Sequence, residues 1–258
     1  MQCVAFRLKT GNWGAQKQTV KNLDPDHIND YFAGIATDQN YDRDRVIQGA
    51  RQALNCPASH VTYSKYSIER ILARISKTSP GNDKVPYWLF LDCSSELAGV
   101  VANIVNLSVG EGVIPAAWRT AVITPVPKCT PASSVADLRP IAFTPILSRI
   151  VERIIVKDHI FPAIPTTAIS DQYGFKPTGS TTAAIVYIIN SVSVMLETNN
   201  YVHCLTIDFS KLFDSVDHLA IIQKLKVLNI SDNILHWEVS FLTDRNQFVH
   251  INEWWSFT

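Results

Sequence analysis

One stretch, Tyr201 to His218 (YVHCLTIDFSKLFDSVDH), limits most strongly what this chain can fold into. Its first part, Val202 to Ile207, is β-branched and apolar without glycine or proline, which predicts a buried strand. Periodicity alone leaves a helical segment open as the alternative. Asp208 ends the run, and a carboxylate there is costly unless it is paired or binds a cation. Because open sheets usually place their chemistry at strand ends, Asp208 is a candidate site residue.

Two further acids follow Asp208 within the same stretch. Asp217 directly precedes the apolar-periodic run HLAIIQKLKVLN, so it is predicted to be the N-cap of a helix that begins at His218. Asp214 stands six residues after Asp208. The spacing of these two acids by itself is a weak signal, and it also fits a metal-dependent phosphohydrolase that uses Asp208 and Asp214.

The stretch LTIDFSKLFDSVDH resembles the first palm motif of reverse transcriptases from non-LTR (LINE-type) retrotransposons, which reads roughly LDFSKAFDxVDH. Four blocks upstream resemble the same family in the same order: SPGNDKVPYWL, LSVGEGVIPAAWRTAVITPVPK, DLRPIAFTPILSRIVERII and DQYGFKPTGSTTAAI. Downstream, FLTDRNQFVHIN resembles the family segment FLxxRxQxVxxN. The resemblance covers about residues 61–258, most of the chain.

This resemblance implies an α/β (α+β) fold, a partial right-hand polymerase with helical fingers and the first strand and helix of the palm. We expect a poorly defined lead-in with one or two short helices over 1–60, fingers over 61–200, and the beginning of the palm over 201–258. Hydrophobic spacing predicts helices near residues 67–77 and 96–109 and after Ser180, and strands over 120–126, 141–143 and 247–252. Pro125 and Pro127 indicate that the first of these strands is an edge strand or ends there.

The family motif assigns roles to residues of the central stretch. Asp208 is implied to be a catalytic metal ligand, helped by the backbone carbonyl of Phe209. Phe213 is implied to stack under the sugar and exclude a 2′-hydroxyl, and its alternative is a core phenylalanine that faces the following helix.

Basic residues upstream are the predicted phosphate contacts. By resemblance, Arg139 in DLRPI and Lys128 lie near the incoming triphosphate, where a guanidinium can bind phosphate oxygens bidentately. The alternatives are a salt bridge of Arg139 with Asp137 and a solvated lysine at the end of a strand. Lys176 and Gly179 are implied to contact the template, and Lys176 stands where the family usually has arginine, so bidentate geometry is lost there.

The implied function is that of a fragment of an RNA-directed DNA polymerase, using two Mg²⁺ ions in the complete enzyme. Its partners would be an RNA template, a DNA primer and deoxynucleoside triphosphates. No FADD-type motif follows residue 218, so we expect this chain alone to be inactive in primer extension. A nucleic-acid-binding relic without chemistry is the alternative.

Composition excludes several other classes of protein. Lysine and arginine number 23, aspartate and glutamate 23, so the formal net charge is zero and only a local basic face could bind nucleic acid. The five cysteines are scattered without a CxxC pair, which argues against a zinc site. The sequence has no apolar run of membrane-spanning length and no signal-peptide core, which predicts an intracellular protein.

Overall fold

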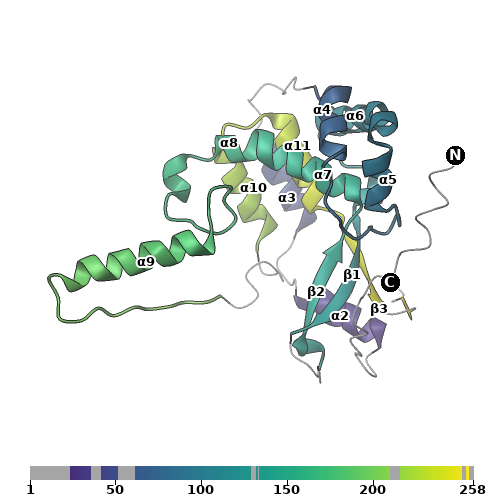
Figure 1. The fold of residues 1–258 in the computed structure, drawn as a ribbon. Helices are drawn as coiled ribbons and strands as arrows, with labels where there is room; N and C mark the ends of the chain where they lie inside the picture. The colour runs from purple at the N-terminus through teal and green to yellow at the C-terminus, as the bar shows by residue number, and fades with distance from the viewer. Residues whose placement is uncertain are drawn as a thin grey trace.

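The computed structural model describes residues 24–35, 42–51, 62–128, 132, 134–209, 216–251 and 254–255, and it has a mixed α/β fold (Figure 1). The α-helices are α2 Pro25–Ile35, α3 Arg43–Arg51, α4 Lys65–Leu72, α5 Tyr87–Asp92, α6 Ser94–Glu111, α7 Ile146–Ile155, α8 Phe161–Ala163, α9 Thr181–Leu196, α10 His218–Val227 and α11 Asp232–Leu242. The shorter helical turns are η1 Ala116–Trp118, η2 Val135–Asp137, η3 Val156–Ile160 and η4 Thr166–Ile169. The strands are β1 Thr120–Pro127, β2 Leu138–Phe143, β3 Asn246–Ile251 and β4 Trp254–Trp255.

The strands form one sheet in the order β2-β1-β3-β4. β1 pairs antiparallel with β2 along its whole second half, but its parallel pairing with β3 covers only Thr120 to Ile123. Pro125 and Pro127 therefore lie where β1 has one neighbour and no donor is needed on the other side. This explains how a strand with two prolines can be internal at one end and an edge at the other.

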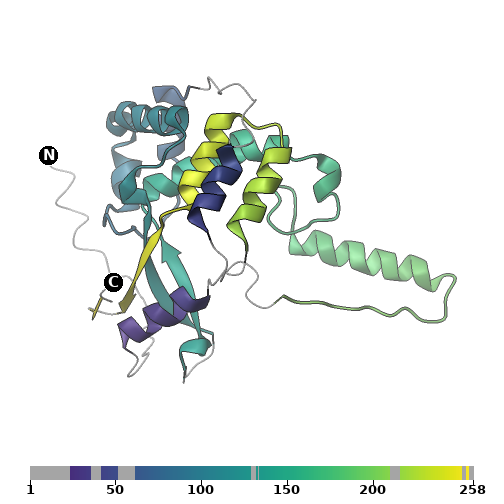
Figure 2. The same cartoon turned by 180° about the vertical axis from the view of Figure 1, so that it is seen from behind.

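Helix α2 lies across one face of this sheet, as Figure 2 shows. The side chains of Ile28 and Phe32 are 0% and 4% exposed and pack on Ala121, Ile123 and Val249. The short helices expected before residue 60 are thus present, and α2 forms one side of a hydrophobic core. Arg43 at the start of α3 adds a bidentate contact, from Nε and an Nη to the carboxylate of Asp244 at 2.6 and 2.8 Å.

The larger core lies among the helices α3, α4, α6, α7, α10 and α11. Trp237 of α11 is its largest fully buried side chain. Its indole Nε1 donates to Ser108 Oγ of α6 at 2.9 Å, and its ring stacks on Phe241 with centroids 5.2 Å apart. These contacts fix α11 against α6, and α11 leads directly into β3.

Two predicted helix starts are confirmed, and a glycine ends a further helix. Ser180 Oγ accepts from Ala183 N at the start of α9, and Asp217 Oδ1 accepts from Leu219 N at the start of α10. Gly112 ends α6 in the left-handed region, with φ +64°. The helix predicted near residues 67–77 is shorter than expected, since α4 ends at Leu72 and a turn follows.

The predicted buried strand over residues 202–207 is wrong. The segment 201–209 is extended but belongs to no strand of the described sheet, and Leu205 and Ile207 are 86% and 71% exposed. It runs beside α9, which projects from the rest of the molecule and has no buried residue (Figures 1 and 2). An apolar sequence is a strand only where a second strand takes up its backbone hydrogen bonds, and no described segment does so here.

The turn at residues 78–84 is packed closely on the start of α7. Arg149 donates to Thr78 Oγ1 at 2.7 Å and to the carbonyl of Ser79. A Cβ added at Gly81 would overlap the backbone N of Pro145 and the carbonyl carbon of Thr144. Glycine is therefore required at position 81, because backbone cannot move aside as a flexible side chain can.

We expect Gly81→Ala to destabilise the chain by about 1–3 kcal/mol, because the new methyl group overlaps backbone atoms. The matched control is Gly99→Ala in the middle of α6, where the nearest atom is 4.0 Å away and alanine should stabilise by up to ~1 kcal/mol. Urea denaturation of both variants measures the difference. Equal midpoints for the two variants would contradict the close approach at Gly81.

Candidate functional site

The carboxylate that the sequence places at the centre of the site is exposed. Asp208 lies on the extended segment 201–209, and neighbouring Phe209 is 68% exposed. Phe213 and Asp214 lie outside the described residues. The structure thus places Asp208 on an accessible segment, without the sheet that was expected to hold it.

A divalent cation needs several oxygen ligands, usually one or two carboxylates together with substrate phosphates. In the parts of the chain that the structure describes, no three His, Cys, Asp or Glu side chains are grouped as a metal site. Asp208 and the carbonyl of Phe209 are oxygen donors of a suitable kind, but by themselves they do not fit a complete site.

Lys128 and Arg139 come together on the ribbon formed by β1 and β2. Arg139 pairs directly with Val126. Lys128 lies one residue beyond β1, but its backbone N donates to the carbonyl of Asp137 at 2.7 Å and so continues the antiparallel pairing. Since Lys128 follows Val126 by two residues, the alternation of side chains puts both basic residues on the same face. Ala121 and Ile123, which pack on α2, have the opposite parity along β1. The two cations therefore lie on the face of the ribbon that α2 leaves uncovered, and both are exposed.

The alternatives for these two cations can be compared with their contacts. Asp137 accepts from the backbone N and the Oγ of Ser134 at 2.9 and 3.1 Å, and no described ion pair joins it to Arg139. Lys128 Nζ donates to the carbonyl of Ala136 at 2.7 Å, which leaves further N–H donors on the ammonium group. Lys128 and Arg139 both retain N–H groups that can donate hydrogen bonds to an anionic group.

The loop before α9 contains the two residues predicted to contact the template. Lys176 Nζ donates to the carbonyl of Ile169 at 3.0 Å, so it points back into the loop. A Cβ at Gly179 would overlap the carbonyl oxygen of Tyr173, so only glycine fits this close approach. The loop also presents Phe175, which is 86% exposed with φ 55°. Lys176 and Gly179 therefore lie in the same loop, and this loop is a different segment from the β1–β2 ribbon.

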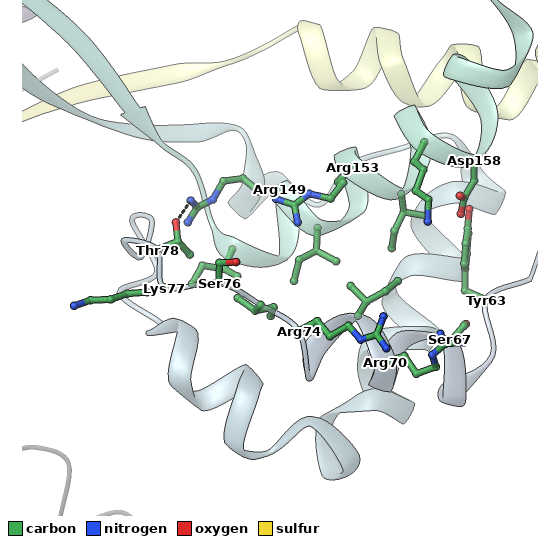
Figure 3. A pocket seen from close by; sticks show the side chains of 16 residues that line it. Tyr63, Ser67, Arg70, Arg74, Ser76, Lys77, Thr78, Arg149, Arg153 and Asp158 are labelled. Atoms are coloured by element: carbon green, nitrogen blue, oxygen red, sulfur yellow. Dashed lines mark hydrogen bonds between the residues drawn. The ribbon is translucent and has the colours of Figure 1, made fainter. Parts of the chain in front are cut away.

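A basic groove between α4 and α7 contains none of the residues that the sequence predicted for the site. It has a volume of about 660 Å³, and Figure 3 shows the side chains that line it. Its cationic members come from both helices and from the segments that follow them: Arg70, Arg74, Lys77, Arg149, Arg153 and Lys157. The four-residue spacing of the last three is visible in the sequence, whereas their position opposite Arg70 and Arg74 depends on packing.

No helix in the described ranges combines the length and the apolar character that crossing a membrane requires.

The chain is similar to known proteins over a region that includes most of the sites described above. A family model described as reverse transcriptase (RNA-dependent DNA polymerase) matches residues 126–256, slightly more than half of the chain. The RNA-directed DNA polymerase from mobile element jockey of Drosophila melanogaster is 27% identical to this chain over 179 residues. These residues are 68% of this chain and 19% of that protein, so the chain spans about a fifth of the relative's length. Lys128 and Arg139, here called the ribbon cations, fall within residues 126–256, as do the loop before α9 and Asp208. Helix α4 falls outside this range.

Proposed function

Because the chain belongs to the reverse transcriptase (RNA-dependent DNA polymerase) family, we propose that it forms the fingers and the opening of the palm of a non-LTR-type RNA-directed DNA polymerase. The observation that carries this proposal is the position of Lys128 and Arg139 on one exposed face of the β1–β2 ribbon. Its substrates are deoxynucleoside triphosphates, and its partners are an RNA template and a DNA primer. The fold is a part of a right-hand polymerase.

The ribbon cations act on the triphosphate. Phosphoryl transfer depends mainly on positioning and on stabilising negative charge, for which a guanidinium fork and an ammonium group are suited. Arg139 binds phosphate oxygens bidentately, and Lys128 adds a second positive charge on the same face. Together they orient the leaving pyrophosphate and lower the cost of the charge that develops on it.

The other predicted residues take the roles that the family motif gives them. Asp208 and the carbonyl of Phe209 are proposed as ligands of Mg²⁺, and Phe213 as the residue that rejects a 2′-hydroxyl. Lys176 and Gly179 are proposed to contact the template. Since the described residues do not make a complete metal site, the proposal rests on the ribbon cations and not on a metal centre.

Family membership removes the alternative of an unrelated phosphohydrolase that uses Asp208 and Asp214. A nucleic-acid-binding relic without triphosphate binding is the alternative that the following experiment separates.

We expect a photoreactive deoxynucleoside triphosphate to cross-link to the 258-residue chain, and Arg139→Ala to lower the yield about tenfold or more. The reason is that hydrogen bonds to charged groups contribute roughly 1.5–3 kcal/mol each. Arg139→Lys keeps the charge without the fork and should give an intermediate yield. The control is Arg45→Ala, an exposed arginine on α3 far along the chain from the ribbon.

Equal yields from Arg139→Ala and Arg45→Ala would refute the assignment of Arg139 to the triphosphate. RNA binding without any triphosphate cross-linking would identify the chain as the relic.

A further inference from the structure

We propose that the groove between α4 and α7, here called the α4–α7 groove, binds the phosphates of a single-stranded nucleic acid. The inference deepens the proposed function, on which it rests for the nature of the ligand, and it assigns a second contact surface apart from the β1–β2 ribbon. Half of this groove comes from α4 and the turn after it, which lie before the residues that the family model matches.

Charge is the first argument for an anionic ligand. The whole chain has equal numbers of acidic and basic residues, yet the groove is lined by six lysine and arginine side chains and one acid, Asp158. A concave surface lined by one sign of charge raises the local concentration of the opposite charge. The basic residues of a neutral chain are thus concentrated where a polyanion can enter.

The second argument is that several of these cations remain available. Arg149 is committed to Thr78 and Ser79, and Figure 3 shows Lys77 pointing away from the centre of the groove. No ion pair of the described residues uses Arg74, Arg153 or Lys157, and all three are exposed. Arg70 lies with its guanidinium carbon 5.9 Å from the centre of the Tyr66 ring, which leaves its N–H donors accessible.

The arrangement of the available cations fits a single strand. Figure 3 shows Arg153 on the α7 side of the groove and Arg70 and Arg74 on the α4 side. Arg153 lies in α7 and Lys157 in the π-helical turn η3 that continues it, so the two cations follow each other along one wall of the groove. Cations on both walls can contact the phosphates of one strand that lies between them.

The floor of the groove argues in the same direction. It consists of isoleucines: Ile146, Ile150 and Ile154 on the α7 side are only 2–6% exposed, and Ile71 and Ile75 on the α4 side are half-buried. The other polyanionic partner that the rims could attract is an amphipathic acidic helix, which would have to bury its apolar face on this floor. The exposed lining residues are mainly cations, and phosphates need only these, so the strand is the better fit.

The test is fluorescence anisotropy of a labelled single-stranded RNA with the 258-residue chain at several salt concentrations. For Arg74→Ala/Arg153→Ala we expect affinity to fall about tenfold near 0.1 M salt, and the log–log salt slope to become shallower by about 1.4, or about 0.7 for each lost phosphate contact. Arg74→Lys/Arg153→Lys keeps both charges and should keep the slope. The control is Arg45→Ala.

Unchanged RNA affinity and slope in Arg74→Ala/Arg153→Ala would overturn the proposal. So would tighter binding of polyglutamate than of RNA with the same dependence on Arg74 and Arg153, which would make the occupant an acidic protein segment. Triphosphate cross-linking should be unaffected by the groove variants. The groove and the triphosphate site at Arg139 can therefore fail independently.

Discussion

Trp237→Ala is expected to remove about 3–5 kcal/mol of stability, the cost typical of deleting a buried aromatic side chain and leaving a cavity. The indole is 0% exposed, stacks on Phe241 and donates to Ser108, so the variant loses packing and leaves the Ser108 hydroxyl without its donor. A domain has only about 5–15 kcal/mol in total, so a large unfolded fraction should appear at moderate temperature.

Thermal denaturation followed by circular dichroism measures this effect. For a chain of this size we expect the Tm to fall by roughly 2–4 °C for each kcal/mol lost. Tyr201→Ala is the matched control, because that aromatic ring is 72% exposed and its removal should change the Tm little. Similar melting curves for the two variants would show that Trp237 does not hold α11 against α6.

Some features around Trp237 and elsewhere in the chain were predictable from the sequence because they depend on neighbouring residues. The strand predicted over 247–252, which follows the helix that contains Trp237, is confirmed by β3. The caps at Ser180 and Asp217 were predictable for the same reason, since each depends on a side chain and the backbone two or three residues away. Such caps can be predicted because both hydrogen-bonding groups lie within a few residues of each other in the sequence.

Contacts between distant segments were not predictable in this way. Nothing in the residues around Thr120 shows that they pair in parallel with a strand that begins at Asn246. The burial of Ile28 against the sheet and the position of Arg70 opposite Arg153 are likewise products of packing. The segment 202–207 is the instructive failure, because its β propensity was recognised but propensity cannot supply a partner strand.

For the candidate site, the sequence indicated candidate residues but not their arrangement. Lys128 and Arg139 share a face because of the register in which Val126 of β1 pairs with Arg139 of β2. That register depends on nonlocal backbone pairing, so the sequence alone indicated the two cations without placing them together. The four-residue spacing of Arg149, Arg153 and Lys157 was visible in the sequence, but their position opposite Arg70 and Arg74 was not.

The second large effect is expected at Glu238, a glutamate of α11 that lies close enough to Glu152 of α7 for the two negative charges to repel each other. One carboxylate oxygen of Glu238 is buried with no hydrogen-bond partner among the described residues. Burial raises the pKa of Glu238 to about 7, and the negative charge of Glu152 adds to the rise. Burial also raises the pKa of Glu152, an effect that Arg245, Arg149 and Arg153 oppose.

The sign of the pH dependence follows from these directions. A carboxyl group with a higher pKa in the folded than in the unfolded chain binds its proton more tightly when folded. Its contribution is therefore fully present below about pH 4.5 and is lost as the pH rises through about 7. The full shift corresponds to roughly 3 kcal/mol, at about 1.4 kcal/mol for each pKa unit.

Glu238→Gln removes the titrating group while nearly keeping its shape, so the variant should be more stable than the parent chain by about 2–3 kcal/mol at pH 8. The difference should shrink toward zero near pH 5, where the parent carboxyl group is protonated in the folded chain. Urea denaturation at intervals of one pH unit measures both curves. Glu111→Gln, at the exposed end of α6, is the control for loss of one surface charge. If the stability that Glu238→Gln gains over the parent is the same at pH 5 and pH 8, as expected for Glu111→Gln, then Glu238 carries no uncompensated buried charge.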